Sequence, residues 1–251
     1  MDKKTLAAAL VFCVAGFVLF AALAFYVASG KGDSGVLHDG PRVKYAEVSR
    51  SDAPDKNSRE TTATKAPPAS DDDMVSVKDY APSIRVELRY ASRKNMTGKK
   101  LYDYHEAYLR YGTVKKLIKA QKKLEKYGMG IKIWDAYRTP AAQKKLWAVC
   151  PNPAYVSDPS KGTSSHTRGS AVDVTLVDMD GTELVMPTEF DNLTKLADRD
   201  YSDIDDEFAR ENAMLLEKTM KSCGFKAYSE EWWHFTDKDS YGVVKDFVPP
   251  E

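Results

Sequence analysis

Residues 164–173 have the sequence Ser164-Ser165-His166-Thr167-Arg168-Gly169-Ser170-Ala171-Val172-Asp173, which continues as Val174-Thr175-Leu176-Val177. Its apolar second half predicts a buried strand over residues 172–177. His166 and Asp173 lie on either side of Gly169, so a loop that turns back at the glycine can bring both side chains to one metal ion, at about 2 Å each. Taken alone, the stretch is also compatible with a hydrogen-bonded turn.

A second segment, Glu231-Trp232-Trp233-His234, carries the remaining chemistry of a metal site. A catalytic zinc commonly has three protein ligands and an open position for water, and a nearby carboxylate accepts the proton of that water. His166, Asp173 and His234 as ligands, with Glu231 as the general base, would fill these roles. The alternative is that the tryptophans and His234 belong to the core and Glu231 is a surface charge.

The two motifs together resemble the zinc D-alanyl-D-alanine peptidases, and most of all the D-Ala-D-Ala dipeptidases associated with vancomycin resistance. The resemblance covers essentially the whole globular part of the chain. The matching segments are Arg89-Tyr90-Ala91, Asn95-Met96-Thr97-Gly98, Trp134-Asp135-Ala136-Tyr137-Arg138, the loop of His166, Met186-Pro187-Thr188-Glu189-Phe190-Asp191 and Glu231-Trp232-Trp233-His234-Phe235. It implies one Zn²⁺ per chain and hydrolysis of D-Ala-D-Ala by a metal-activated water.

The resemblance also implies roles for four further residues. Arg138 would stabilise the oxyanion of the tetrahedral intermediate, Tyr90 and Asp191 would hold the free ammonium of the substrate, and Ser164 would lie near the substrate. From the residues alone, a salt bridge to Asp135 is the preferred explanation of Arg138, and Ser164 could equally be a turn-forming serine.

Two positions depart from the pattern of the family. Thr139 stands where the family usually has proline after the arginine, and Pro187 stands where it has glycine after the methionine. We therefore expect the loops that carry Arg138 and Asp191 to differ in path from those of the relatives.

Two other functions are compatible with the same motifs. A peptidoglycan D,D-carboxypeptidase would use the same zinc centre on a wall stem peptide, and export of the chain would favour it. A non-catalytic wall-binding module would keep only a structural zinc, but a general base and an open coordination position argue against this interpretation.

The N-terminal part of the chain predicts export. Residues 5–28 form an uncharged apolar run that is long enough to span a membrane, and Lys3 and Lys4 precede it. We expect residues 1–29 to be a single-pass anchor, or a cleaved signal peptide of a secreted protein, residues 30–73 to be a flexible linker, and residues 74–251 to be a peptidase domain outside the cytoplasm. With 37 basic and 37 acidic residues, the chain has no charge excess that would favour nucleic acid.

The pattern of the domain predicts an α+β fold with an antiparallel or mixed sheet, flanking helices and a single zinc site. Cys150 and Cys223 are expected to be separate thiols. The elements we expect are strands at 75–77, 84–90 and 131–134, a helix capped by Thr113 and stopped by Gly128, a helix from Thr139 to Ala148, a helix over 205–223, and a last strand and turn within 225–235.

Overall fold

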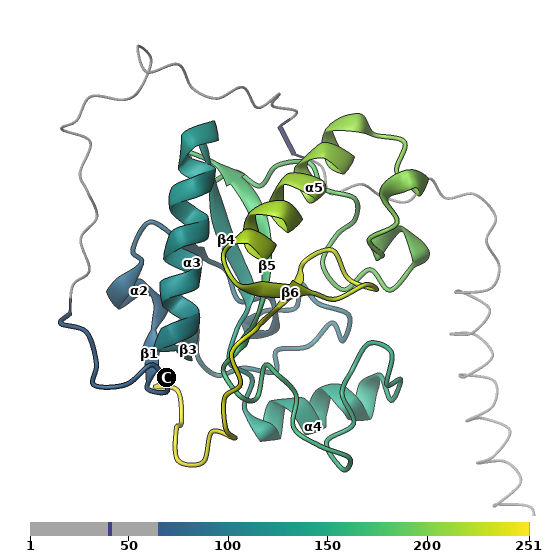
Figure 1. The fold of residues 1–251 in the computed structure, drawn as a ribbon. Coiled ribbons are helices and arrows are strands. Elements are labelled where there is room, and N and C mark those ends of the chain that lie inside the picture. Colours follow the sequence, from purple (N-terminus) through teal and green to yellow (C-terminus); the bar gives the residue numbers. More distant parts are fainter. Residues whose placement is uncertain (1–39, 42–64, 251) are drawn as a thin grey trace, which may run out of the picture. The chain divides into compact units, whose positions relative to one another are not determined.

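The computed structural model describes residues 40–41 and 65–250, all of which fall in the same unit of the chain. The unit is an α+β domain, as predicted (Figure 1). Its helices and strands are β1 (Met74–Ser76), α2 (Val77–Tyr80), β2 (Arg85–Val86), β3 (Tyr108–Arg110), α3 (Tyr111–Leu124), β4 (Met129–Asp135), α4 (Pro140–Val149), β5 (Ala171–Asp178), α5 (Glu207–Ser222), β6 (Phe225–Ala227) and β7 (His234–Asp237).

The central sheet has five strands in the order β2-β4-β5-β7-β6. Only β2 and β4 are parallel, and the other neighbours are antiparallel, so the sheet is mixed. The strand predicted from the apolar run is β5, at the centre of the sheet, where all but its last residue are buried. A separate two-stranded sheet pairs β1 with β3.

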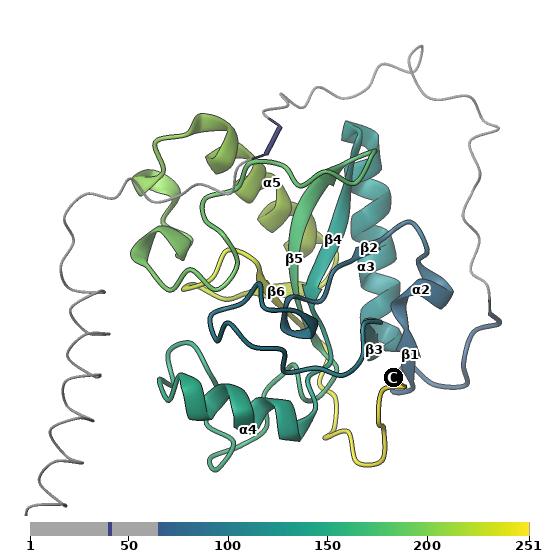
Figure 2. The ribbon, with the colours of Figure 1, turned by 180° about the vertical axis from the view of Figure 1, so that it is seen from behind.

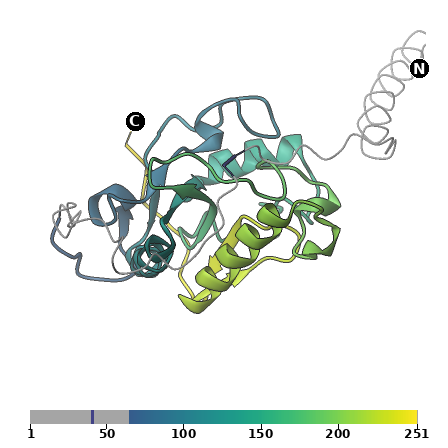
Figure 3. The same ribbon diagram turned by 90° about the horizontal axis from the view of Figure 1, so that it is seen from above.

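Two amphipathic helices cover one face of this sheet. Helix α3 packs on β4, α5 packs on β5 and β6, and the two helices contact each other (Figures 1 and 3). Their buried positions recur at helical spacing, for example Val114 with Leu117 and Ala213 with Leu216. Helix α4 lies beyond the end of the long strands, and its N-cap Thr139 accepts a hydrogen bond from the Ala142 amide (Figure 2).

Two predicted elements are wrong. The expected strand over 84–90 pairs with β4 only at Arg85 and Val86, and the chain then forms a 3-10 turn over Arg89–Ala91. The Arg89 side chain forms a buried ion pair with Glu183 at 2.9 Å, which holds this turn in place.

Thr113 is not the N-cap of its helix, which already begins at Tyr111. The free amides of Tyr111 and Gly112 donate to the carbonyls of Asp73 and Asp71, so backbone from the preceding segment caps the helix. Thr113 is buried inside the first turn and donates instead to Asp237.

The predicted membrane segment over residues 5–28 and most of the predicted linker lie outside the described residues. Within residues 40–41 and 65–250, no helix has the length and apolar character that crossing a membrane requires. Cys150 and Cys223 are free thiols, as predicted.

Candidate active site

Three predicted ligands meet where the central strands end beside α4. Asp173 lies on β5 and His234 on β7, directly opposite each other in the antiparallel ladder. His166 comes from the loop before β5, which turns at Gly169 with a φ of 71°. Glycine adopts such a conformation without strain, so the predicted turning point of the loop is correct.

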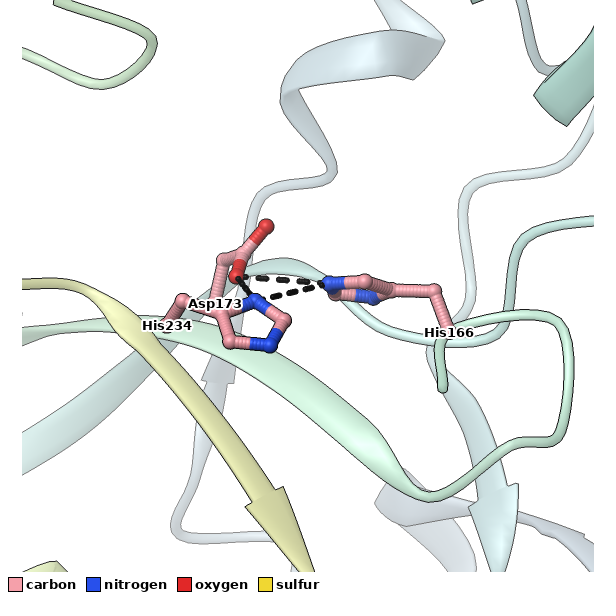
Figure 4. Close-up of side chains that lie close together, drawn as sticks. All are labelled: His166, Asp173 and His234. Carbon is pink, nitrogen blue, oxygen red and sulfur yellow. Dashed lines mark hydrogen bonds and ion pairs between the residues drawn. The ribbon is translucent and has the colours of Figure 1, made fainter. Parts of the chain in front are cut away.

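The ligand atoms of these three residues converge on one point (Figure 4). His166 Nε2 lies 3.1 Å from His234 Nδ1 and 3.4 Å from Asp173 Oδ1, and the last two atoms are 2.9 Å apart. Tetrahedral bonds of about 2.0–2.1 Å would place ligand atoms about 3.3 Å from one another. The donor set and its spacing therefore fit one face of a tetrahedral zinc site, with the fourth position left for water.

The outer nitrogen of each imidazole has a partner of its own. His166 Nδ1 lies 2.8 Å from the Ala136 carbonyl, which can only accept, so Nδ1 carries the proton and Nε2 offers its lone pair to the site. His234 Nε2 lies 3.1 Å from Thr236 Oγ1, on the side away from the other two ligands. Partners of this kind fix the orientation and tautomer of metal-binding histidines.

Glu231 lies beside this cluster but is not one of its three members. Its nearest carboxylate oxygen is 3.9 Å from His234 Nδ1, and the side chain is buried. Burial raises the pKa of Glu231 well above its usual value, and the carboxylates of Asp173 and Asp191 raise it further. The adjacent Trp232 and Trp233 are core residues, so the core interpretation of this segment holds for the tryptophans.

Arg138 is buried and held from several sides. Its Nη2 and Nε atoms lie 2.6 and 3.2 Å from Asp135 Oδ2, and its Nη1 donates to Gln143 on α4. Burial acts to lower the pKa of Arg138, but Asp135 together with Tyr102, Tyr90 and Asp173 outweighs burial, so the pKa lies well above its usual value and the guanidinium stays charged. The predicted salt bridge to Asp135 is therefore present, and the same guanidinium also faces the cavity that contains the ligand cluster.

Tyr90 and Asp191 form a second polar group in this cavity. The Tyr90 hydroxyl donates to Asp191 Oδ1 at 3.0 Å, and the Met96 amide donates to Oδ2 at 2.9 Å. Burial is the main cause that raises the pKa of Asp191 to about 7. Asp191 also has a positive φ of 61°, a conformation that Asn and Asp tolerate better than other side chains.

Ser164 lines the cavity and also shapes the loop of His166. Its hydroxyl accepts from the His166 amide at 3.2 Å, and its carbonyl accepts from the Arg168 amide. The turn-forming interpretation of Ser164 is thus correct, and its position near the substrate stays a prediction.

The structure brings all eight predicted site residues to the same cavity of about 510 Å³. The sequence interpretation missed Gln143, which orients Arg138, and Tyr102, whose hydroxyl donates to Asp135 at 2.6 Å. The only signal for Gln143 was its spacing of three residues from the buried Leu146 on α4. The cavity also contains Lys226, which no sequence pattern singled out.

Comparisons with known proteins place the chain in one family. Residues 70–248 match the family model described as D-ala-D-ala dipeptidase. The chain is 36% identical to the D-alanyl-D-alanine dipeptidase of Escherichia coli (strain K12) over 184 residues, which are 71% of this chain and 94% of that protein. It is 32% identical to the enzyme of the same name from Enterococcus faecium, over 62% of this chain and 87% of that protein. With its His-Asp-His cluster and neighbouring Glu231, the chain belongs to the D-ala-D-ala dipeptidase family of metallopeptidases.

Proposed function

We propose that this protein hydrolyses D-Ala-D-Ala to two D-alanine molecules with one zinc ion held by His166, Asp173 and His234. The ligand atoms of these three residues lie within 4.8 Å of one another, and the buried carboxylate of Glu231 lies beside them. This geometry is the main support for the proposal. The names of the relatives, which are D-alanyl-D-alanine dipeptidases, support the choice of substrate.

When bound, the zinc supplies a Lewis acid that activates water and polarises the scissile carbonyl. Glu231 takes the proton of the attacking water and then delivers it to the leaving amine. Its raised pKa suits both steps, because a carboxylate of higher pKa accepts the proton of water more readily and the resulting carboxyl group holds that proton nearer to neutral pH until the amine leaves.

Arg138 supplies hydrogen bonds to the developing oxyanion. Arginine has five N–H donors, and the contacts to Asp135 and Gln143 occupy three of them. The remaining N–H groups of Nη1 and Nη2 are available to the substrate. Because Asp135 and Gln143 fix the plane of the guanidinium, these donors are already oriented before the charge develops.

Asp191 and Tyr90 form the binding site for the free ammonium of the dipeptide. Each carboxylate oxygen of Asp191 already accepts one hydrogen bond and keeps a lone pair for the ammonium. Burial raises the pKa of Asp191 more than these hydrogen bonds and the charge of Arg138 lower it, so a substrate ammonium beside it would stabilise the ionised carboxylate. An N-acylated substrate would leave this carboxylate unpaired, which costs about 2–5 kcal/mol where desolvation is substantial.

We propose further that residues 5–28 anchor the protein in a membrane with the peptidase domain outside the cytoplasm, or that they direct its secretion. The apolar run and the two preceding lysines support this location. An exported enzyme has access to the peptidoglycan stem peptide, which keeps the D,D-carboxypeptidase as the second candidate.

Substrate length separates the two candidates. On one zinc-loaded preparation, we expect cleavage of D-Ala-D-Ala to be at least about a hundredfold faster than cleavage of an N-acylated D-Ala-D-Ala, the ratio that about 2.7 kcal/mol produces. The Asp191→Ala variant should reduce this preference. Equal or faster cleavage of the acylated peptide would replace the dipeptidase by the carboxypeptidase.

A further inference from the structure

The active-site cavity has a cation that no role described above uses. Lys226 lies on the edge strand β6 and lines the cavity. Its register partner on β7 is Thr236, whose hydroxyl contacts His234 Nε2. Paired residues of neighbouring strands point to the same face, so the Lys226 side chain lies on the face of the sheet that carries the metal ligands.

The charges of the cavity follow the strand order of the sheet. On one side, Tyr90 follows β2 and is hydrogen-bonded to Asp191, and Arg138 follows β4. The ligands Asp173 and His234 lie on the next two strands, β5 and β7. Lys226 lies on β6, at the opposite edge of the sheet. The Asp191 carboxylate and the Lys226 ammonium are therefore on opposite sides of the ligand cluster. Strands are about 4.8 Å apart, which puts Lys226 about two strand spacings beyond Asp173.

A zwitterionic dipeptide matches this arrangement in both length and charge. An extended dipeptide spans about 7 Å, and a lysine ammonium sits on a flexible four-carbon stem. With its ammonium at Asp191 and its scissile carbonyl at the ligand cluster, the C-terminal residue of the substrate points toward β6. Its carboxylate then comes within reach of the Lys226 ammonium.

The other cation of the cavity is already neutralised on the opposite side. Arg138 is paired with Asp135 at 2.6 Å, and its guanidinium lies over the Tyr90 ring at 5.1 Å. In the part of the chain that the structure describes, the Lys226 ammonium forms no hydrogen bond or ion pair, and the side chain is exposed. It is thus free to pair with an incoming anion.

We propose that Lys226 binds the C-terminal carboxylate of the substrate and makes a free carboxyl terminus a requirement for efficient cleavage. The inference rests on the proposed function, because it takes the orientation of the substrate from the Asp191 end. The group that Lys226 binds is the free D-alanine carboxylate of the dipeptide, whose ammonium sets this orientation.

The test compares D-Ala-D-Ala with its C-terminal amide in the wild type and in Lys226→Met. We expect Lys226→Met to lower kcat/KM for the free acid about tenfold, mainly through KM, and to change that for the amide less than about twofold. Lys226→Arg should retain most of the preference for the acid. The matched control is Lys238→Met, which removes the same charge from an exposed lysine outside the cavity and should leave both substrates unaffected.

Calorimetry gives the same comparison without turnover. It measures binding of D-Ala-D-Ala and of its C-terminal amide to the Glu231→Gln variant, with and without Lys226→Met. The role of Lys226 would be overturned if Lys226→Met lowered kcat/KM and affinity equally for the acid and the amide, or did not lower them for the acid. A wild type that cleaves neither compound would overturn the proposed function itself, so the two failures are distinguishable.

Discussion

Replacing Asp191 by asparagine tests whether this carboxylate is held in a site built for a cation. The substitution keeps the shape of the side chain and suits the positive φ of 61° at this position. Asparagine can still accept a hydrogen bond from the Tyr90 hydroxyl or the Met96 amide. What it removes is the negative charge.

The expected effect on stability follows from the pKa of Asp191. Folding raises this pKa from 3.8 to about 7, chiefly by burial, so the ionised form is disfavoured in the folded state. As the pH rises from about 4 to about 7, the unfolded state loses its proton first, and the wild type loses stability relative to the variant. At about 1.4 kcal/mol per pH unit the upper bound is about 4 kcal/mol, and the part of Asp191 open to the cavity reduces this to about 2–4 kcal/mol.

Urea unfolding of the metal-free wild type and of Asp191→Asn between pH 4 and 8 measures this difference. A chelator in both samples removes the contribution of metal binding. We expect the unfolding free energy of the variant to rise relative to that of the wild type up to about pH 7. Above that pH the difference should stay constant. A difference that does not change from pH 4 to 8 would refute the raised pKa. With zinc restored, the variant should show a higher KM for D-Ala-D-Ala, because the ammonium has lost its partner.

Other substitutions test the remaining roles. Glu231→Gln should keep its metal and lose about 10²–10⁴-fold in turnover, as metal analysis and kinetics would show, and loss of metal together with activity would contradict its role as base. Arg138→Ala should lower kcat more than it raises KM, by about 10²–10³-fold, and an unchanged kcat would remove it from the oxyanion role. The same variant should lose about 3–5 kcal/mol of unfolding free energy because Asp135 is left unpaired, and the additional change Asp135→Asn should restore part of it. Thr139→Ala should cost about 1 kcal/mol through loss of the α4 cap while Thr139→Ser does not, and equal stabilities would show that the cap is unimportant.

The sequence predicts most of the site because its signals are local. The turn at Gly169, the apolar run of β5 and the segment from Glu231 to His234 each depend on neighbouring residues. The periodic apolar positions of α3 and α5 likewise predict which face of each helix is buried. These local preferences are present in the folded domain because its long-range contacts stabilise the same structures.

The predictions are wrong where contacts with residues distant in the sequence determine the local structure. The alternating pattern from Ile84 to Tyr90 predicts a strand, but pairing of Arg89 with Glu183, 94 residues later, ends it early. The hydroxyl of Thr113 is typical of an N-cap, yet backbone carbonyls of the preceding segment cap the helix and Thr113 contacts Asp237 instead. Gln143 and Lys226 belong to the site only through tertiary packing. The spacing of Gln143 from Leu146 predicts a buried position but no contact with Arg138, and no spacing along the chain indicates the place of Lys226.

The zinc content of the purified protein is the decisive measurement for the ligand set of His166, Asp173 and His234. Metal analysis of the wild type should give one zinc per chain, because three ligand atoms within 2.9–3.4 Å of one another match one face of a tetrahedral site. The His166→Ala variant should bind zinc far more weakly and lose it on dialysis, while the Lys238→Met control should keep it. Full zinc occupancy in His166→Ala would contradict the ligand set on which the account depends.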